Sequence, residues 1–265
     1  MKTRIISALV MLPLLGIVYL GGIYLEVAAI LVTFIGLKEI YEAFEAAGFK
    51  PWKILGYLSV PSIYLVDRAI GGAAAFTPWI MTLMFGCMIY GFRLDTVKIK
   101  DMAVTLFGAV YVVLSFFFVV LIDRSGSFSS YIWLVFIISL GTDTLAYFTG
   151  MLIGKHKLCP DLSPKKTIEG AVGGVIGAVV LASLFEAFVV KGGNALSFNF
   201  IVMAIIGSVV SQLGDLSASS IKRRTGIKDY GNLIPGHGGI MDRFDSVLFV
   251  APYLYIYITY ILPFM

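Results

Sequence analysis

Long apolar stretches separated by short polar segments limit what this 265-residue chain can fold into. We count about nine such stretches, most of them near the ~20 residues that a membrane-spanning helix needs. Hydrophobic residues make up 59% of the chain and the mean hydropathy is +0.93, whereas soluble domains stay near ~45–50% apolar. We therefore predict an all-α, polytopic integral membrane helical bundle. The predicted transmembrane helices cover roughly 5–24, 27–46, 53–67, 72–92, 102–122, 130–153, 168–190, 198–221 and 245–263.

The distribution of Lys and Arg predicts the orientation of these helices, because cytoplasmic loops carry an excess of positive charge. With the N-terminus in the cytosol, the 20 Lys and Arg residues all fall on the cytosolic side except Arg68, Arg124 and Lys191. The first apolar stretch is too long for a signal peptide and lacks a small-residue cleavage site, so we expect it to remain as a helix. We divide the chain into N-terminal helices at 1–125, for packing and lipid access, and a motif-bearing C-terminal region at 126–265. Together they form one membrane unit.

The segment from Ser219 to Asp245 concentrates charge between the last two apolar stretches. Several of its cations can hold a polyphosphate: Lys222, Arg223, Arg224, Lys228 and Arg243. Its carboxylates are hard oxygen ligands of the kind that Mg²⁺ prefers: Asp229, Asp242 and Asp245. Gly238 and Gly239 follow His237, and their missing side chains let backbone N–H groups approach an anion. The segment therefore predicts phosphate chemistry.

Asp215 is an acid inside a predicted membrane helix. It precedes Lys222 by about seven residues and so lies about 10 Å below the cytosolic mouth of that helix, at 1.5 Å per residue. An ionised acid at this depth costs ~2.5–3.5 kcal/mol by insertion scales, so it needs a partner or a wet cavity. That partner is either a bound ligand or a cation in a structural ion pair.

The chain resembles the phosphatidate cytidylyltransferase family, also called CDP-diacylglycerol synthases, in two blocks. The first block reproduces the family signature in order: Ser219, Lys222-Arg223, Lys228-Asp229, Gly231, His237-Gly238-Gly239, Asp242-Arg243 and Asp245. The second is similar to the family's upstream block: Asp143-Thr144-x-Ala146-Tyr147-x-x-Gly150, then Leu162-Ser163-Pro164-Lys165-Lys166-Thr167-x-Glu169-Gly170. Met151 departs from the pattern, because relatives often carry Arg there. The N-terminal half carries no motif that we can assign.

The resemblance implies a membrane enzyme that condenses CTP with phosphatidic acid to give CDP-diacylglycerol and pyrophosphate, with Asp215 and Asp242 as the carboxylates of a Mg²⁺ site. Further catalytic residues would be Lys222, Arg223 and Asp245. The substrates would be bound by Asp143, Ser163, Lys165, Lys166, Ser219, Lys228, Asp229, His237, Gly238, Gly239 and Arg243. The expected partners are CTP, phosphatidic acid, membrane lipids and a second copy in a homodimer, with no nucleic acid. The expected location is a bacterial-type inner membrane, with the active site facing the cytosol.

Several of these residues have simpler interpretations that the sequence leaves open. Lys165 and Lys166, at the start of the seventh span, are also typical of juxtamembrane charges that fix topology or touch lipid headgroups. Asp242 and Asp245 share a face if the ninth helix begins near Met241, and an acid in a first turn is ordinary capping. His237 is also typical of a polar hinge. Asp143 is either a ligand or a buried polar contact.

Two other functions compete with the leading one. A cytidylyltransferase that acts on another lipid phosphate would use the same loops, because they bind phosphates and not acyl chains. A membrane transporter would also place acids in its spans, but it would not need the charged cytosolic loop.

Overall fold

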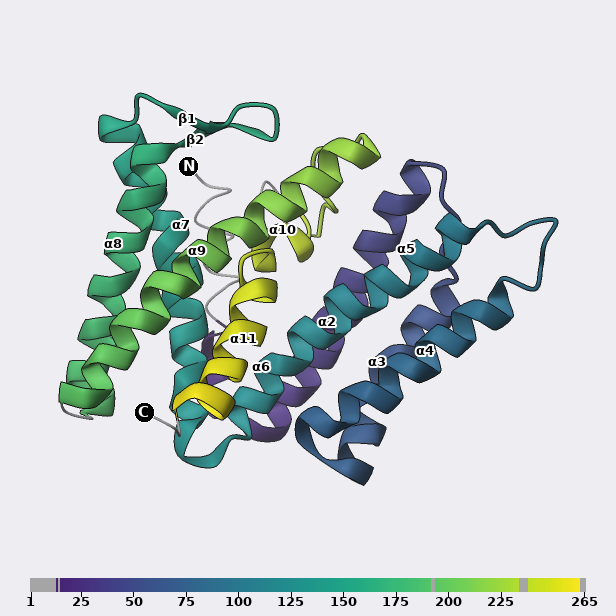
Figure 1. Ribbon diagram of the computed structural model, residues 1–265, viewed down its shortest axis with the longest axis horizontal. Coiled ribbons are helices and arrows are strands. Elements are labelled where there is room, and N and C mark those ends of the chain that lie inside the picture. The colour runs from purple at the N-terminus through teal and green to yellow at the C-terminus, as the bar shows by residue number, and fades with distance from the viewer. Residues whose placement is uncertain (1–12, 14, 192–193, 234–237, 263–265) are drawn as a thin grey trace. The chain divides into compact units, whose positions relative to one another are not determined.

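The computed structural model describes residues 13, 15–191, 194–233 and 238–262 (Figure 1). Most of the described residues are helical. Five of the described helices are long and apolar enough to cross a membrane, by length and composition. They are Gly72–Tyr90, Ile99–Asp123, Gly126–Ile153, Ile168–Val190 and Phe198–Thr225. This confirms the predicted all-α membrane fold class. The count of about nine spans and the cytosolic N-terminus stay predictions.

The remaining predicted spans have identifiable reasons for falling outside this set. Helices α2 (Gly22–Ala46) and α3 (Lys53–Ile70) form where spans are predicted, but both carry charged residues. Pro61 lies inside α3 without ending it. The last apolar helix, Val247–Ile261, is shorter than the others. In the first predicted span, roughly 5–24, residues 5–12 and 14 lie outside the described residues.

The chain divides into two compact units, and the signature loop groups with the N-terminal helices. The first unit is Met1–Leu121 with Lys222–Arg243, and the second is Ile122–Ile221 with Phe244–Met265. The sequence analysis placed residues 222–243 in the C-terminal region instead. The grouping matters because it brings part of α2 to the charged loop.

The first unit is built from helices around a buried aromatic core. Besides α2 and α3 it contains η1 (Gly72–Ala75), α4 (Phe76–Tyr90), α5 (Ile99–Ala109), the π-helical η2 (Val110–Leu114), α6 (Ser115–Asp123) as far as Leu121 and α10 (Met241–Phe244) as far as Arg243. Tyr41 is fully buried, and its hydroxyl donates to the carbonyl of Thr105 at 2.8 Å. A Cβ at Gly108 would overlap the Tyr41 ring, so glycine is needed for this packing. The core therefore fixes the C-terminal half of α2 against α5.

The second unit is built on a close pair of helices, α7 (Ile132–Ile153) and α8 (Ile168–Phe185). A Cβ at Gly174 would lie 3.0 Å from the Thr142 carbonyl of α7, and one at Gly170 would lie 2.7 Å from the Ala146 carbonyl. The glycine spacing on α8 therefore serves close helix packing, as in small-xxx-small interfaces. The other helices of this unit are η3 (Gly126–Tyr131), η4 (Glu186–Val190), α9 (Asn194–Thr225) as far as Ile221, α11 (Val247–Ile256) and η5 (Tyr257–Ile261).

A small hairpin precedes α8 and was not expected from the sequence. Strands β1 (Lys157–Cys159) and β2 (Ser163–Thr167) pair antiparallel. Thr167 caps α8 by accepting a hydrogen bond from the Gly170 N–H at 3.1 Å. Lys165 and Lys166 therefore lie on a strand before the helix, and not in its first turn.

Candidate active site

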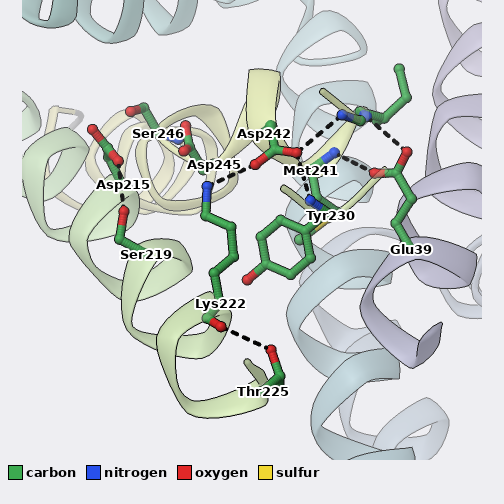
Figure 2. A network of polar contacts seen from close by, with 12 residues as sticks. Glu39, Asp215, Ser219, Lys222, Thr225, Tyr230, Met241, Asp242, Asp245 and Ser246 are labelled. Carbon is green, nitrogen blue, oxygen red and sulfur yellow. Dashed lines mark hydrogen bonds and ion pairs between the residues drawn. The ribbon is translucent and has the colours of Figure 1, made fainter. Parts of the chain in front are cut away.

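Asp242 is the centre of the polar contacts in the signature loop of the first unit (Figure 2). Its Oδ1 lies 2.7 Å from the Nζ of Lys222. Its Oδ2 accepts hydrogen bonds from the backbone N–H groups of Tyr230 at 2.7 Å and Gly239 at 3.0 Å. The side chains of Asp242 and Lys222 are only 4% and 13% exposed. Because buried charges must be paired, the loop folds around this ion pair.

The glycines of the loop make room for protein carboxylates. Gly238 has φ +85°, in the left-handed region that favours glycine, and a Cβ there would lie 2.7 Å from Asp242 Oδ2. Gly239 is buried, and its N–H points at the same oxygen. The Asp242 side chain is thus an anion that lies next to both of these glycines.

Glu39 of α2 also reaches this loop, and the sequence analysis did not single it out. Its carboxylate accepts hydrogen bonds from the N–H groups of Ile240 at 3.0 Å and Met241 at 2.8 Å (Figure 2). The sequence offered one sign of this role: Glu39 is an acid inside a predicted apolar span, in Gly36-Leu37-Lys38-Glu39-Ile40-Tyr41. Because the nearby Lys38 and Glu42 are charged as well, Glu39 could not be distinguished from an exposed residue by sequence alone.

In the second unit, Asp215 forms an ion pair with Lys166 of β2. Its other oxygen lies 3.4 Å from the hydroxyl of Ser219, one turn later on α9 (Figure 2). The side chains of Asp215 and Lys166 are 24% and 26% exposed. Asp215 therefore has the partner that its depth in the helix demands, and that partner comes from the second motif block.

A second acid of this unit, Asp143 of α7, accepts a hydrogen bond from the hydroxyl of Ser246 at 3.1 Å. Ser246 follows Asp245 in a turn that packs on α9, where a Cβ at Gly214 would lie 2.7 Å from the Asp245 carbonyl. Gly214 is thus the residue that lets this turn approach the segment carrying Asp215. The contacts tie Asp143 to the turn.

Asp242 and Asp245 were expected to share one helix face if the ninth helix began near Met241, and that condition is not met, because no single helix contains both residues. Helix α10 ends at Phe244, and α11 begins only at Val247. The Asp245 carboxylate accepts the N–H of Ser246 at 2.8 Å, and such a local bond competes with helical hydrogen bonding. Asp245 therefore lies in the turn between two helices, where it is buried.

Most of the other predicted site residues are exposed or partly exposed. Lys165, Arg223, Lys228 and Asp229 are exposed, and Ser163 is partly exposed at the start of β2. The Nε of Arg243 is buried and has no hydrogen-bond partner among the described residues. His237 lies outside the described residues.

Comparisons with known proteins show which family the chain belongs to. A family model described as Cytidylyltransferase family matches residues 2–261. The chain belongs to the cytidylyltransferase family. This confirms the family predicted from the two motif blocks and favours an enzyme over a transporter.

Similar bacterial relatives carry the name phosphatidate cytidylyltransferase. Those of Staphylococcus saprophyticus and Staphylococcus aureus are each 34% identical to the chain, over 269 and 274 residues. Both alignments cover 96% of this chain and 97% of the relative. The relative from Bacillus subtilis is 39% identical over 165 residues, which cover 61% of this chain and 60% of the relative.

Asp215 and Asp242 are the carboxylates expected to hold Mg²⁺, and carboxylate oxygens are ligands of the kind that Mg²⁺ prefers. Among the described residues no group of three or more His, Cys, Asp or Glu gathers. Mg²⁺ does not need one, because it is usually bound by one or two carboxylates together with waters and substrate phosphates. Asp242 is oriented by two backbone N–H groups, and each of Asp242 and Asp215 has a lysine ammonium at one oxygen. Each carboxylate thus already has a lysine ammonium as its counter-charge, which a bound Mg²⁺ would have to share or displace.

Proposed function

We propose that this protein is a phosphatidate cytidylyltransferase, which transfers the cytidylyl group of CTP to phosphatidic acid and releases pyrophosphate. The observation that carries the proposal is the signature loop folded around the buried Lys222–Asp242 pair. Membership of the cytidylyltransferase family and the printed name of the relatives support it. The proposed substrates are therefore CTP and phosphatidic acid.

Lys222 and Lys166 are the proposed contacts for the triphosphate. An ammonium has three N–H donors, so a lysine that donates one to a carboxylate can still donate to a phosphate. Asp242 and Asp215 hold these two ammonium groups in place before substrate binds. Arg223, Lys165 and Lys228 are exposed and supply further positive charge. Arg243, with its buried Nε, is proposed to contact the same phosphates.

The proposed chemistry is an in-line displacement without a covalent enzyme intermediate. A phosphate oxygen of phosphatidic acid forms a bond to the α-phosphorus of CTP, while the bond from that phosphorus to the β-phosphate oxygen breaks. That phosphate is largely ionised near neutral pH, since a phosphate's second pKa is ~6, and no strong general base is required. The protein's part is mostly positioning and charge neutralisation. Asp215 and Asp242 are each proposed as a Mg²⁺ ligand, and the metal would neutralise charge on the triphosphate.

We further propose that the signature loop faces the cytosol of a bacterial inner membrane. The bias of Lys and Arg supports this orientation, and CTP is a cytosolic nucleotide. Phosphatidic acid has two acyl chains, so it would enter from the bilayer.

The test is transfer of label from CTP to lipid by the purified protein in detergent. With CTP labelled at the α-phosphate, phosphatidic acid and Mg²⁺, label should enter the lipid together with an equal amount of released pyrophosphate. Asp242→Asn is the matched control, because it removes the charge but keeps the shape. Polyprenyl phosphate and an ether-lipid phosphate should accept little label. Transfer to one of these instead would reassign the acceptor, and transfer to no lipid would refute the proposal.

A further inference from the structure

Glu39 is a buried acid that the reaction scheme does not use. It lies on α2, in the N-terminal part of the chain, and is only 5% exposed. Its neighbours Lys38 and Glu42 are 61% and 47% exposed at their side chains. Burying a carboxylate is costly unless it is hydrogen-bonded, so Glu39 needs a specific reason to lie on the inner face of α2.

The reason is a socket formed by the signature loop. Both carboxylate oxygens are used: Oε1 accepts the Ile240 N–H at 3.0 Å, and Oε2 accepts the Met241 N–H at 2.8 Å. Two glycines of the signature leave space for the side chain, since a Cβ at Gly231 or at Gly239 would overlap the Glu39 carboxylate. Hydrogen bonds to a charged acceptor are roughly twice as strong as neutral ones.

The residue that follows this socket is Asp242. The N–H groups held by Glu39 belong to the two residues just before Asp242, and the N–H of Gly239 is held by Asp242 itself (Figure 2). Glu39 and Asp242 thus hold the N–H groups of three consecutive residues, 239–241, between them. Removing Glu39 would free the backbone on which the Asp242 side chain is oriented.

We propose that Glu39 is a positioning residue for the transfer reaction: it holds the Ile240–Met241 backbone so that the Asp242 carboxylate faces Lys222. This inference rests on the proposed function, and it adds a residue from the part of the chain without an assigned motif. Glu39 does not touch the substrates. It acts through Asp242.

The geometry requires a carboxylate of this length. A glutamine has one acceptor oxygen and an NH₂ donor, so it would place a donor against one of the two N–H groups. An aspartate keeps the charge but is shorter by one methylene group. We expect both Glu39→Gln and Glu39→Asp to loosen the loop.

The closing experiment measures backbone hydrogen exchange and kinetics on the full-length protein in detergent. In Glu39→Gln, peptides that cover 238–244 should exchange at least about tenfold faster, which corresponds to about 1.4 kcal/mol. Peptides from α7 and α8 should be unchanged, because these helices belong to the second unit. Glu42→Gln removes the same charge from the exposed face of α2 and should change neither region. Glu26→Gln alters another buried acid of α2 and should leave 238–244 unchanged.

The kinetic arm separates positioning from a purely structural role. At saturating substrate, kcat of Glu39→Gln should fall at least about tenfold, while KM for phosphatidic acid stays within about twofold. Glu39→Asp should show the same pattern, whereas Glu42→Gln and Glu26→Gln should keep wild-type kcat. Unchanged exchange at 238–244, unchanged kcat in Glu39→Gln, or full activity in Glu39→Asp would each overturn the role of Glu39. A wild-type protein that transfers no label to lipid would instead refute the proposed function, whatever the exchange shows.

Discussion

The Lys222–Asp242 pair allows stability and activity to be separated by a double mutant. We consider Asp242→Asn, Lys222→Met and the two changes combined. Each single change leaves one buried group without its partner, whereas the double variant removes both charges and keeps similar volume. Because both residues are also proposed to serve the reaction, the double variant should regain stability without regaining activity.

The structure sets the expected size of the effect. Breaking a buried ion pair by removing one partner costs ~3–5 kcal/mol. Asp242 is 4% exposed and Lys222 is 13% exposed, so a value near the lower limit, about 3 kcal/mol, is expected for each single change. The double variant should recover about 2 kcal/mol of this, because replacing both members of a buried ion pair by uncharged groups of similar volume is often close to neutral. At ~2 °C per kcal/mol for a chain of this size, the singles should unfold about 6 °C lower and the double about 2 °C lower.

The assays are thermal unfolding in detergent and transfer of label from CTP to phosphatidic acid. All three variants should lose activity by about 10²-fold or more, the size seen when one charge-stabilising contact is removed from an active site. The Lys53–Glu45 pair is the matched control, because its N–O distance is also 2.7 Å but its side chains are 33% and 44% exposed. Glu45→Gln should cost no more than about 1 kcal/mol and leave activity intact.

Two results would refute this reasoning. Near-normal activity in Asp242→Asn would remove Asp242 from the catalytic site. If the double variant unfolds at no higher temperature than the less stable single variant, the two charges do not compensate each other in the folded protein.

Three further predictions test the loop, the metal and the topology. Gly238→Ala should lose most activity, because its Cβ would press on Asp242. Gly48→Ala is the control: Gly48 also has a positive φ but nothing within 4 Å of its Cβ, so the protein should only be destabilised by about 1 kcal/mol. Equal activity in the two variants would contradict the role of Gly238. Chelation of divalent cations should abolish transfer and added Mg²⁺ should restore it, while persistent activity in chelator would exclude a metal requirement. In a cysteine-free background, Lys228→Cys should react with an impermeant thiol reagent only from the cytosolic side and Ser127→Cys only from outside, and the reverse pattern would invert the topology.

The positions of the helices could be predicted closely, because they follow from apolar runs of the right length. The seventh span was expected at about 168–190, and the helix there runs from Ile168 to Val190. The hairpin before α8 was missed, because three- and five-residue strands give too short a pattern and their lysines resemble ordinary juxtamembrane charges.

The candidate site could be predicted where its partners are close in sequence or share a motif. Lys222 and Asp242 both belong to the signature, and the structure pairs them. Glu39 was missed because its contacts with Ile240 and Met241 span 201 and 202 positions, and no local spacing rule reports a bond of that kind. The break between α10 and α11 was missed because a carboxylate in a first turn is equally typical of a continuing helix.

The two ion pairs share one feature, the pairing of an acid with a lysine, and the cost of buried charge explains it. In each unit an acid expected to bind metal is paired with a lysine expected to bind triphosphate, Asp242 with Lys222 and Asp215 with Lys166. A free acid or a free lysine at either position would be penalised by desolvation, so each compensates the other before substrate arrives. A magnesium–nucleotide complex carries both signs of charge, and it can satisfy the lysine and the acid together where a bare nucleotide would satisfy only the lysine. If the proposed function holds, we expect the metal complex of CTP to be used in preference to free CTP.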